Sequence, residues 1–455
     1  MFLETKKLYQ YIFLLIITSM VIFNGGNNNF YIQFNFIIVS IFFLIIIRQK
    51  NYLANVKSLI LKNKIPFIFY SLFLGFLIFQ TIPLPIEWLN FFSPEKYEIL
   101  DKLEFNGNFH SISLSPIGSY FSLLNYLTLF LYLIIFKTLF YRKKSILKFY
   151  YFLSFVGAFA ASVAIYFYLI GNPDFWIIKN TNKAAATGFF INRTVFSCFL
   201  ILCFFSGIEY LKNIDNYRKE EVNNFFNKIY IRIFILLITI GIITSFSRLG
   251  NFLFISLIIL FILKELLDNS KKNRFFLTTL ILIVLFDVLI LGVYFGSEKL
   301  IQRYSFLQSE MNSYSLSALE PTTPDTATNR GYLAKFAFSE FKKFIFFGYG
   351  AGSFENLFKV NFINLTTNYA SHAHSDLIEF VGEFGLVGFT LVTLSMMSYY
   401  TNRKNFLFKN FTLLYLLIFI LFFDFSFHIP IIQILFVLLF SICLLYTSPS
   451  PRDKR

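Results

Sequence analysis

A stretch near the end of the chain, SHAHSDLIEFVGEFGLVG (Ser371–Gly388), gathers groups that can exchange protons directly beside an apolar run. His374 lies just before that run, and an imidazole with its ordinary pKa of about 6.5 can accept a proton at neutral pH. His372, two residues earlier, offers the same chemistry. The structural alternative is an interfacial histidine that packs or forms hydrogen bonds, so the neighbouring groups must decide between the two roles.

Two glutamates follow in the same stretch. Glu379 and Glu383 are four residues apart, which on a helix places both on one face. A carboxylate in a membrane-spanning helix must face the protein interior or a polar cavity. Gly382, Gly385 and Gly388 form a stripe of small residues, which favours close helix packing over phosphate binding. The stretch therefore predicts a helix with an inward-facing acidic side.

Three arginines lie away from the basic connections that orient the chain. Arg193 is in TGFFINRTVFSCFL, Arg248 is in TSFSRLGNFLF, and Arg330 is in TATNRGYLAKFAF. Each is expected on the outward side, where the positive-inside bias disfavours cations. A shared anionic partner would explain them, whereas snorkelling toward lipid phosphate is the alternative for any one of them. FGYGAGSF, after Arg330, lacks a lysine and a strand-turn-helix context, so it predicts no nucleotide site.

Histidines and carboxylates can also bind a divalent metal, but the spacing argues against that here. The outer segments contain His110, Asp325 and Asp376 without an HExxH or DxD pattern, and three arginines nearby would repel a cation. We therefore expect no metal and no cofactor. Asp424 and His428, four residues apart near the last apolar runs, are expected to pair with each other for a structural reason.

The composition identifies an integral membrane protein. Of 455 residues, 56% are hydrophobic, 67 are Phe, and the mean hydropathy is +0.64. The net charge of +15 comes from short Lys and Arg clusters between apolar runs, which indicates topology signals and no nucleic-acid partner. Cys198, Cys203 and Cys443 lie inside apolar runs without CxxC spacing, so neither a disulfide framework nor a zinc site is predicted.

Twelve apolar runs can cross a bilayer as helices, each needing roughly 20 residues. They are 9–23, 30–47, 65–83, 119–140, 149–170, 189–209, 230–247, 249–267, 275–296, 376–400, 411–427 and 429–446. Basic clusters alternate along the connections, so both termini are expected in the cytoplasm and 84–118, 171–188 and 297–375 outside it.

We therefore expect an all-α polytopic protein with one membrane domain over 1–446, which includes the long periplasmic loop segment 297–375. The remaining residues, 447–455 (TSPSPRDKR), abruptly lose the apolar character and are expected not to be native.

At this point the residues resemble the bacterial O-antigen ligase and polymerase superfamily. HSDLIEFVGEFGLVG fits its signature of His, then Asn, Ser or Gln, then nine residues and Gly-x-x-Gly, with His374 and Gly385–Gly388 in register. TGFFINRTVF, SFSRLG, FGYGAGSF, ISLSP and the LPLP turn are similar to further segments of that superfamily, in the same order. The departure is Thr194–Val195, where the superfamily often has Asn-His.

The resemblance implies an all-helical glycosyltransferase of the C type that uses an undecaprenyl-diphosphate-linked glycan and no cofactor. Arg193 and Arg248 would hold the donor diphosphate, and His374 would take the proton of the acceptor hydroxyl, with inversion. The further substrate-binding candidates are Arg330, Glu383 and His372. The implied location is the bacterial inner membrane, with the active site facing the periplasm and the lipid bilayer as surroundings.

The acceptor stays open at this stage. Lipid A core would make the protein an O-antigen ligase of lipopolysaccharide biosynthesis, and this is the reading that the signature favours. A growing glycan would make it an O-antigen or exopolysaccharide polymerase, and a protein acceptor an O-oligosaccharyltransferase. A polysaccharide transporter or flippase is a different class, and it predicts polar residues spread through mid-membrane instead of gathered at one face.

Overall fold

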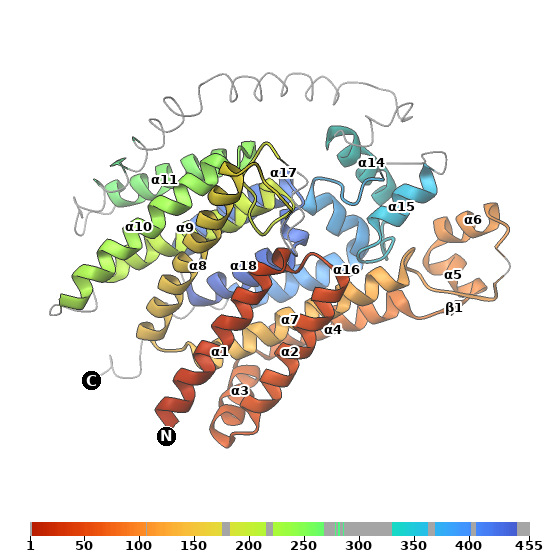
Figure 1. Cartoon of the computed structure of the whole chain (residues 1–455). Helices are drawn as coiled ribbons and strands as arrows, with labels where there is room; N and C mark the ends of the chain where they lie inside the picture. The colour runs from red at the N-terminus through yellow and green to blue at the C-terminus, as the bar shows by residue number, and fades with distance from the viewer. Residues whose placement is uncertain are drawn as a thin grey trace.

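The computed structural model describes residues 2–105, 107–174, 183–214, 222–267, 330–362, 369–401 and 406–443, with four isolated positions between 278 and 285. These residues are almost entirely helical (Figure 1). The helices are α1 (Phe2–Ile22), α2 (Asn29–Ile47), α3 (Lys50–Lys62), α4 (Lys64–Thr81), α5 (Ile86–Phe92), α6 (Pro94–Lys102), α7 (Pro116–Leu139), α8 (Lys143–Leu169), α9 (Arg193–Ile214), α10 (Val222–Thr244), α11 (Arg248–Leu267), α14 (Arg330–Lys343), α15 (Phe354–Asn361), α16 (Asp376–Thr401), α17 (Phe406–Phe423) and α18 (Pro430–Cys443). Two 3-10 turns, η1 (Asn24–Gly26) and η4 (Ser426–His428), and two short strands, β1 (Leu84–Pro85) and β2 (Phe109–His110), complete them.

Nine described helices are long and apolar enough to cross a membrane, which confirms the all-α polytopic prediction. They are Glu4–Ile22, Asn29–Ile47, Lys64–Thr81, Pro116–Leu139, Lys143–Leu169, Arg193–Ile214, Phe225–Thr244, Arg248–Leu267 and Asp376–Tyr399, and each coincides with a predicted span. Two shorter apolar helices, Phe411–Phe423 and Pro430–Ile442, fall on the last two predicted spans. The part 297–329 of the predicted outer segment, the tail 447–455 and, apart from four isolated positions, the predicted span 275–296 lie outside the described residues.

The spans pack as two groups joined by α18. Helices α8, α9 and α10 lie against one another, and α4, α7 and α16 form the other group. Helix α18 contacts both α7 and α9 (Figure 1). In the most apolar stretch of α9, 94% of the residues are buried, so this helix is the centre of the first group and has protein on all sides. The arrangement leaves the ends of α9, α16 and α18 close to one another.

The segment between α4 and α7 forms a small polar unit beside the bundle. Strands β1 and β2 pair antiparallel around α5 and α6. Lys96 of α6 is buried, and its Nζ donates to the carbonyl oxygens of Ser111 (2.6 Å) and Ser113 (2.5 Å). Burial lowers the pKa of Lys96 to about 8. Ser113 Oγ in turn lies 3.0 Å from Ser353 Oγ, so the ISLSP segment is fastened to the glycine-rich loop before α15.

Helix α16 is broken at Gly385, whose φ of 59° lies in the left-handed region. The carbonyls freed by the break accept hydrogen bonds from the glycine-rich loop: Tyr349 N donates to Gly382 O (3.0 Å) and Gly350 N to Glu383 O (3.2 Å). Gln80 of α4, fully buried, adds a bond from its Nε2 to Glu383 O (2.9 Å). These bonds satisfy backbone groups that have no helical partner and no water in the bundle interior.

The glycine stripe of α16 permits this docking, as predicted. A Cβ at Gly382 would lie 2.6 Å from the Tyr349 ring, and one at Gly388 would lie 2.5 Å from the Phe76 ring. At Gly348 in the opposing loop, a Cβ would meet Glu383 O at 2.2 Å. The Gly-x-Gly-x-Gly spacing of that loop therefore serves close contact with α16.

Replacing the glycine at the break tests how much the docked loop contributes. Gly385→Ala forces a Cβ to within 2.3 Å of Phe346 O at a positive φ, and should lower the free energy of unfolding by roughly 2 kcal/mol or more. Gly75→Ala in α4 is the matched control, because nothing lies within 4 Å of the added Cβ. Thermal unfolding in detergent measures both. Equal stability of the two variants would contradict a strained break.

Candidate active site

Polar side chains converge where α16 begins. The loop before α16 carries His372 and His374, α16 itself contributes acidic residues, and the connection from α17 through η4 to α18 approaches from the other side. Asp376 N donates to Asp424 O (3.0 Å), which joins the start of α16 to the end of α17. The four carboxylates of this cluster are buried; they are Asp376, Glu379, Glu383 and Asp424.

Glu379 fixes the loop that carries His372 and His374 through two hydrogen bonds. One carboxylate oxygen lies 2.9 Å from His372 Nδ1, and the other accepts from Ala373 N at 2.7 Å. The side chain of Glu379 is only 1% exposed, so its charge has no water to stabilise it and depends on partners within the protein, of which these are two. The backbone between the two histidines is thereby fixed against the first turn of α16.

His374 adopts an unusual backbone conformation, with φ at +57°. A positive φ is uncommon for a residue with a side chain and persists where surrounding contacts impose it. Nδ1 of His374 is buried and has no hydrogen-bond partner among the described residues. Burial, together with the positive charge of Arg330 nearby, lowers the pKa of His374 to about 3. The imidazole is therefore neutral at pH 7, which is the form that can accept a proton.

His428 is the cation at the centre of the acidic groups. Its Nδ1 pairs with Asp376, and its Nε2 lies 3.4 Å from Glu379 Oε1 and 3.7 Å from Glu383 Oε2. The ring stacks on Phe380 with 4.1 Å between centroids. Burial alone would lower the pKa of His428, but the carboxylates of Glu379 and Asp376 outweigh it and raise that pKa well above the ordinary value. The imidazolium balances charge that would otherwise be buried without a partner.

Arg330, at the first position of α14, reaches the same cluster. Its guanidinium lies 3.8 Å from Asp424 Oδ1, and Asp424 also accepts a hydrogen bond from Ser426. Asp424 is fully buried, whereas the Arg330 side chain is 31% exposed. The arginine therefore has one end on an internal carboxylate while part of it stays accessible. This is the arrangement expected of a cation that can also meet an anionic ligand.

An aromatic residue separates the two histidines. Phe425 stacks on the His372 ring with 4.8 Å between centroids, and meets the His374 ring at 72° with 5.0 Å between centroids. The ring fixes the direction of both imidazoles, because neither can rotate without losing this contact.

Arg193 and Arg248 lie at the first positions of two adjoining helices, α9 and α11. Asn192 Oδ1 caps α9 by accepting from Thr194 N (2.7 Å), and Ser247 Oγ caps α11 by accepting from Gly250 N (3.1 Å). A helix start presents free N–H groups and positive dipole charge, which favour anions. Both arginines are half-buried, and each makes contacts inside the protein.

These two helix ends lie close to each other and near the histidine cluster. A Cβ at Gly250 of α11 would be 2.3 Å from Ser197 Oγ of α9. Cys198, the next residue of α9, contacts Ser426, which bonds to Asp424. The predicted site residues thus fall into two neighbouring sets at one end of the bundle: His372, His374, Arg330 and Glu383 in one, and Arg193 and Arg248 in the other.

The sequence missed the role of His428. Asp424 and His428 were expected to pair as neighbours on one helix face, and this is wrong, because α17 ends at Phe423 and η4 turns the chain. His428 instead bonds to Asp376, 52 residues away. His110, another candidate for an outer metal site, lies on β2 with Nε2 3.1 Å from Gly107 O. Asp325 lies outside the described residues.

Three of the clustered side chains also have the spacing of a metal site. One ligand atom from each of His372, Glu379 and His428 lies within 4.8 Å of the other two. These groups already have internal partners, since His372 bonds to Glu379 and His428 bonds to Asp376. A cation would have to replace the His372–Glu379 hydrogen bond.

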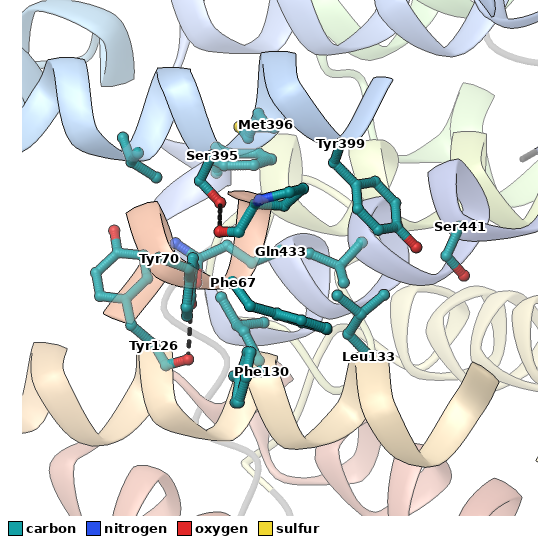
Figure 2. A pocket seen from close by; sticks show the side chains of 15 residues that line it. Phe67, Tyr70, Tyr126, Phe130, Leu133, Ser395, Met396, Tyr399, Gln433 and Ser441 are labelled. Carbon is teal, nitrogen blue, oxygen red and sulfur yellow. Dashed lines mark hydrogen bonds between the residues drawn. The ribbon is translucent and has the colours of Figure 1, made fainter. Parts of the chain in front are cut away.

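An apolar cavity of about 160 Å³ lies between α4, α7, α16 and α18, deeper in the bundle. Figure 2 shows the apolar side chains of Phe67, Phe130, Leu133 and Met396 around it, together with Ser395, Gln433 and Ser441. The Tyr70 hydroxyl donates to Tyr126 O at 2.8 Å along its wall. Phe427 also lines it, and the backbone N–H of Phe427 donates to Asp376 of the polar cluster.

Residues 233–393 match the family model described as O-antigen ligase. The matched segment contains Arg248, Arg330 and His374 with most of α16, whereas Arg193 and His428 lie outside it. No curated protein matches the chain.

Removing the central cation should destabilise the protein in a pH-dependent way. His428→Asn leaves three buried carboxylates without their imidazolium and should lower the free energy of unfolding by roughly 3 kcal/mol at pH 6. Because folding raises the pKa of His428, its contribution is fully present below its unfolded pKa of about 6.5 and is lost as pH rises through the folded value. Thermal unfolding between pH 6 and pH 10 measures the difference. His110→Asn, outside the cluster, serves as the control, and a pH-independent loss at His428 would contradict the charge assignment.

Proposed function

We propose that this multi-helix membrane protein, whose residues 233–393 match the O-antigen ligase family model, transfers a glycan from a polyprenyl diphosphate to an acceptor hydroxyl. The donor is undecaprenyl-diphosphate-linked glycan, and the reaction takes place at the periplasmic face of the inner membrane. The charge bias of the connections supports that orientation, because it leaves the start of α16 on the outward side.

The arginines bind the donor diphosphate in this proposal. Arg193 and Arg248 begin two adjoining helices, where guanidinium groups and free backbone N–H groups attract the same anion. Their charge matters most as the anomeric C–O bond breaks, since negative charge then grows on the leaving diphosphate. Arg330, already on Asp424, is the third cation within reach of that headgroup.

His374 accepts the proton of the acceptor hydroxyl. The hydroxyl oxygen attacks the anomeric carbon, its proton passes to His374, and the bonding pair leaves with the diphosphate, so the configuration inverts. The low pKa of His374 depends partly on Arg330. A bound diphosphate would offset that arginine and raise the basicity of the imidazole at the moment when the donor is in place. Donor binding would thereby make His374 a stronger base.

One observation carries the proposal most: the family match and the polar cluster coincide at the start of α16. There His374 is held at a positive φ beside Arg330, on a loop clamped by Glu379. Glu383 and His372 face the same cluster as supports of the loop or contacts to substrate. No ATP and no metal are needed, because the donor brings its own activated leaving group.

The family match leaves the acceptor class open. We propose lipid A core, as in an O-antigen ligase, with a polymerase or a protein O-oligosaccharyltransferase as the alternatives within the superfamily. A flippase for the same lipid is the alternative outside it. Three histidines and four buried carboxylates of the described residues gather at the start of α16, which favours transfer over transport.

Removing the imidazole tests the base. His374→Ala should reduce glycan transfer roughly 100-fold or more in proteoliposomes supplied with lipid-linked donor, because acid-base help is lost. Folding should persist, since Nδ1 of His374 makes no hydrogen bond to a described residue. Full activity of His374→Ala would contradict the assignment.

Transfer by the wild-type protein should continue in EDTA. Loss of transfer in EDTA would indicate a cation at His372, Glu379 and His428.

Removing one arginine should weaken use of the donor. Arg193→Ala and Arg248→Ala are each expected to lower kcat/KM at least tenfold, because one charge-assisted contact to the diphosphate is lost. Arg48→Ala, an exposed arginine just after α2, is the matched control and should keep full activity. Initial rates at varied donor concentration give the answer. An unchanged kcat/KM in both variants would remove these arginines from the site.

A further inference from the structure

A second cavity, of about 830 Å³, lies far from the polar cluster, where α1, α8, α9 and α10 meet. Its lining includes Lys7 in the second turn of α1, Lys144 in the first turn of α8 and Ile214 at the end of α9. The other end of α1 leads into η1, and the N–H of Ile191, just before α9, donates to Asn24 there. The cavity is therefore at the opposite end of the bundle from Arg193 and Arg248.

The rim of this cavity is basic. Lys7 of α1 faces Lys144 and Lys148 of α8, and the latter two are four residues apart on one helix face. All three are exposed, and none of them has an ion-pair or hydrogen-bond partner among the described residues. Among the described residues, no acidic side chain lines the cavity. The rim thus carries three positive charges that are not neutralised within the described part of the chain.

The walls change character with depth in the same order on both helices. On α8, Lys148 is followed one turn later by Tyr151 and then by Phe155. On α1, Lys7 is followed by Tyr11 and then by Leu15. From the rim inward, each helix thus presents a cation, a tyrosine and then a hydrocarbon side chain. This order matches the layers of a bilayer, which are the phosphate groups, the interfacial region and the acyl chains. From Lys7 to Leu15 the helix rises roughly 12 Å, enough to follow the upper part of an acyl chain.

The cavity opens toward the membrane. Leu15 is 67% exposed and Phe155 is 50% exposed, although both belong to membrane-spanning helices. Deeper lining residues, such as Leu14 and Leu147, are buried. A ligand can therefore enter sideways from the bilayer, with its chain between α1 and α8 and its headgroup at the lysines.

From this arrangement we infer that the cavity is a binding site for an anionic phospholipid. The phosphate headgroup lies among Lys7, Lys144 and Lys148, and an acyl chain lies along Leu15 and Phe155. A neutral lipid would leave the three lysines without a partner, and a free phosphate would leave the apolar walls uncovered. The site is separate from the proposed glycan transfer and does not depend on it.

The test is lipid binding to the purified full-length chain in detergent. Phosphatidylglycerol should bind and raise the melting temperature in a concentration-dependent way, whereas phosphatidylcholine should not. The triple variant Lys7→Gln, Lys144→Gln, Lys148→Gln should lower the affinity for phosphatidylglycerol about tenfold or more. Native mass spectrometry counts the bound lipid, and the melting temperature without lipid shows whether the variant is folded.

A matched control removes the same charge elsewhere. Lys57→Gln, Lys62→Gln, Lys64→Gln changes three exposed lysines on α3 and α4, outside the cavity, and should alter the affinity less than twofold. Equal losses in the two triple variants would show unspecific attraction and overturn the site. So would equal binding of phosphatidylglycerol and phosphatidylcholine, or full competition by millimolar inorganic phosphate.

Discussion

The structure depends on how four buried carboxylates are neutralised at one end of a membrane bundle. Asp376, Glu379 and Glu383 belong to α16, and Asp424 follows α17. Charges removed from water are tolerated only when paired and hydrogen-bonded. Here the partners come from other segments: His428 between α17 and α18, His372 from the preceding loop and Arg330 from α14. The need for these partners draws four segments, distant in sequence, to one place.

The break in α16 also helps to hold the acidic cluster in place. A continuous helix would leave no carbonyl for the glycine-rich loop, which bonds to Gly382 and Glu383 and is fastened in turn to the serine-rich ISLSP segment. The glycine-rich loop therefore holds the acidic helix α16 in place through these backbone hydrogen bonds. In the proposed reaction, a rigid frame of this kind holds His374 at one position while a large lipid-linked donor enters and leaves.

Much of this could be predicted from the sequence, because the strongest signals are local. Hydropathy located the nine spans, and the i, i+4 spacing of Glu379 and Glu383 indicated the inward face of α16. The contact of His428 with Asp376 could not be predicted, because it joins residues 52 positions apart through a turn that hydropathy does not reveal. The expected Asp424–His428 pair failed because α17 ends one residue before Asp424. The left-handed φ at Gly385 could not be predicted either, because a glycine in an apolar run is equally compatible with a straight helix. It is the docked loop that sets this φ.

The most direct test of the account follows the fate of the lipid carrier. Purified protein in proteoliposomes would receive undecaprenyl-diphosphate-linked glycan and an acceptor, and released undecaprenyl diphosphate and transferred glycan would be measured together, with the anomeric configuration of the new bond. The account predicts one lipid diphosphate released for each glycan transferred, with inversion. Movement of the intact lipid-linked glycan across the bilayer without release of the carrier would contradict it.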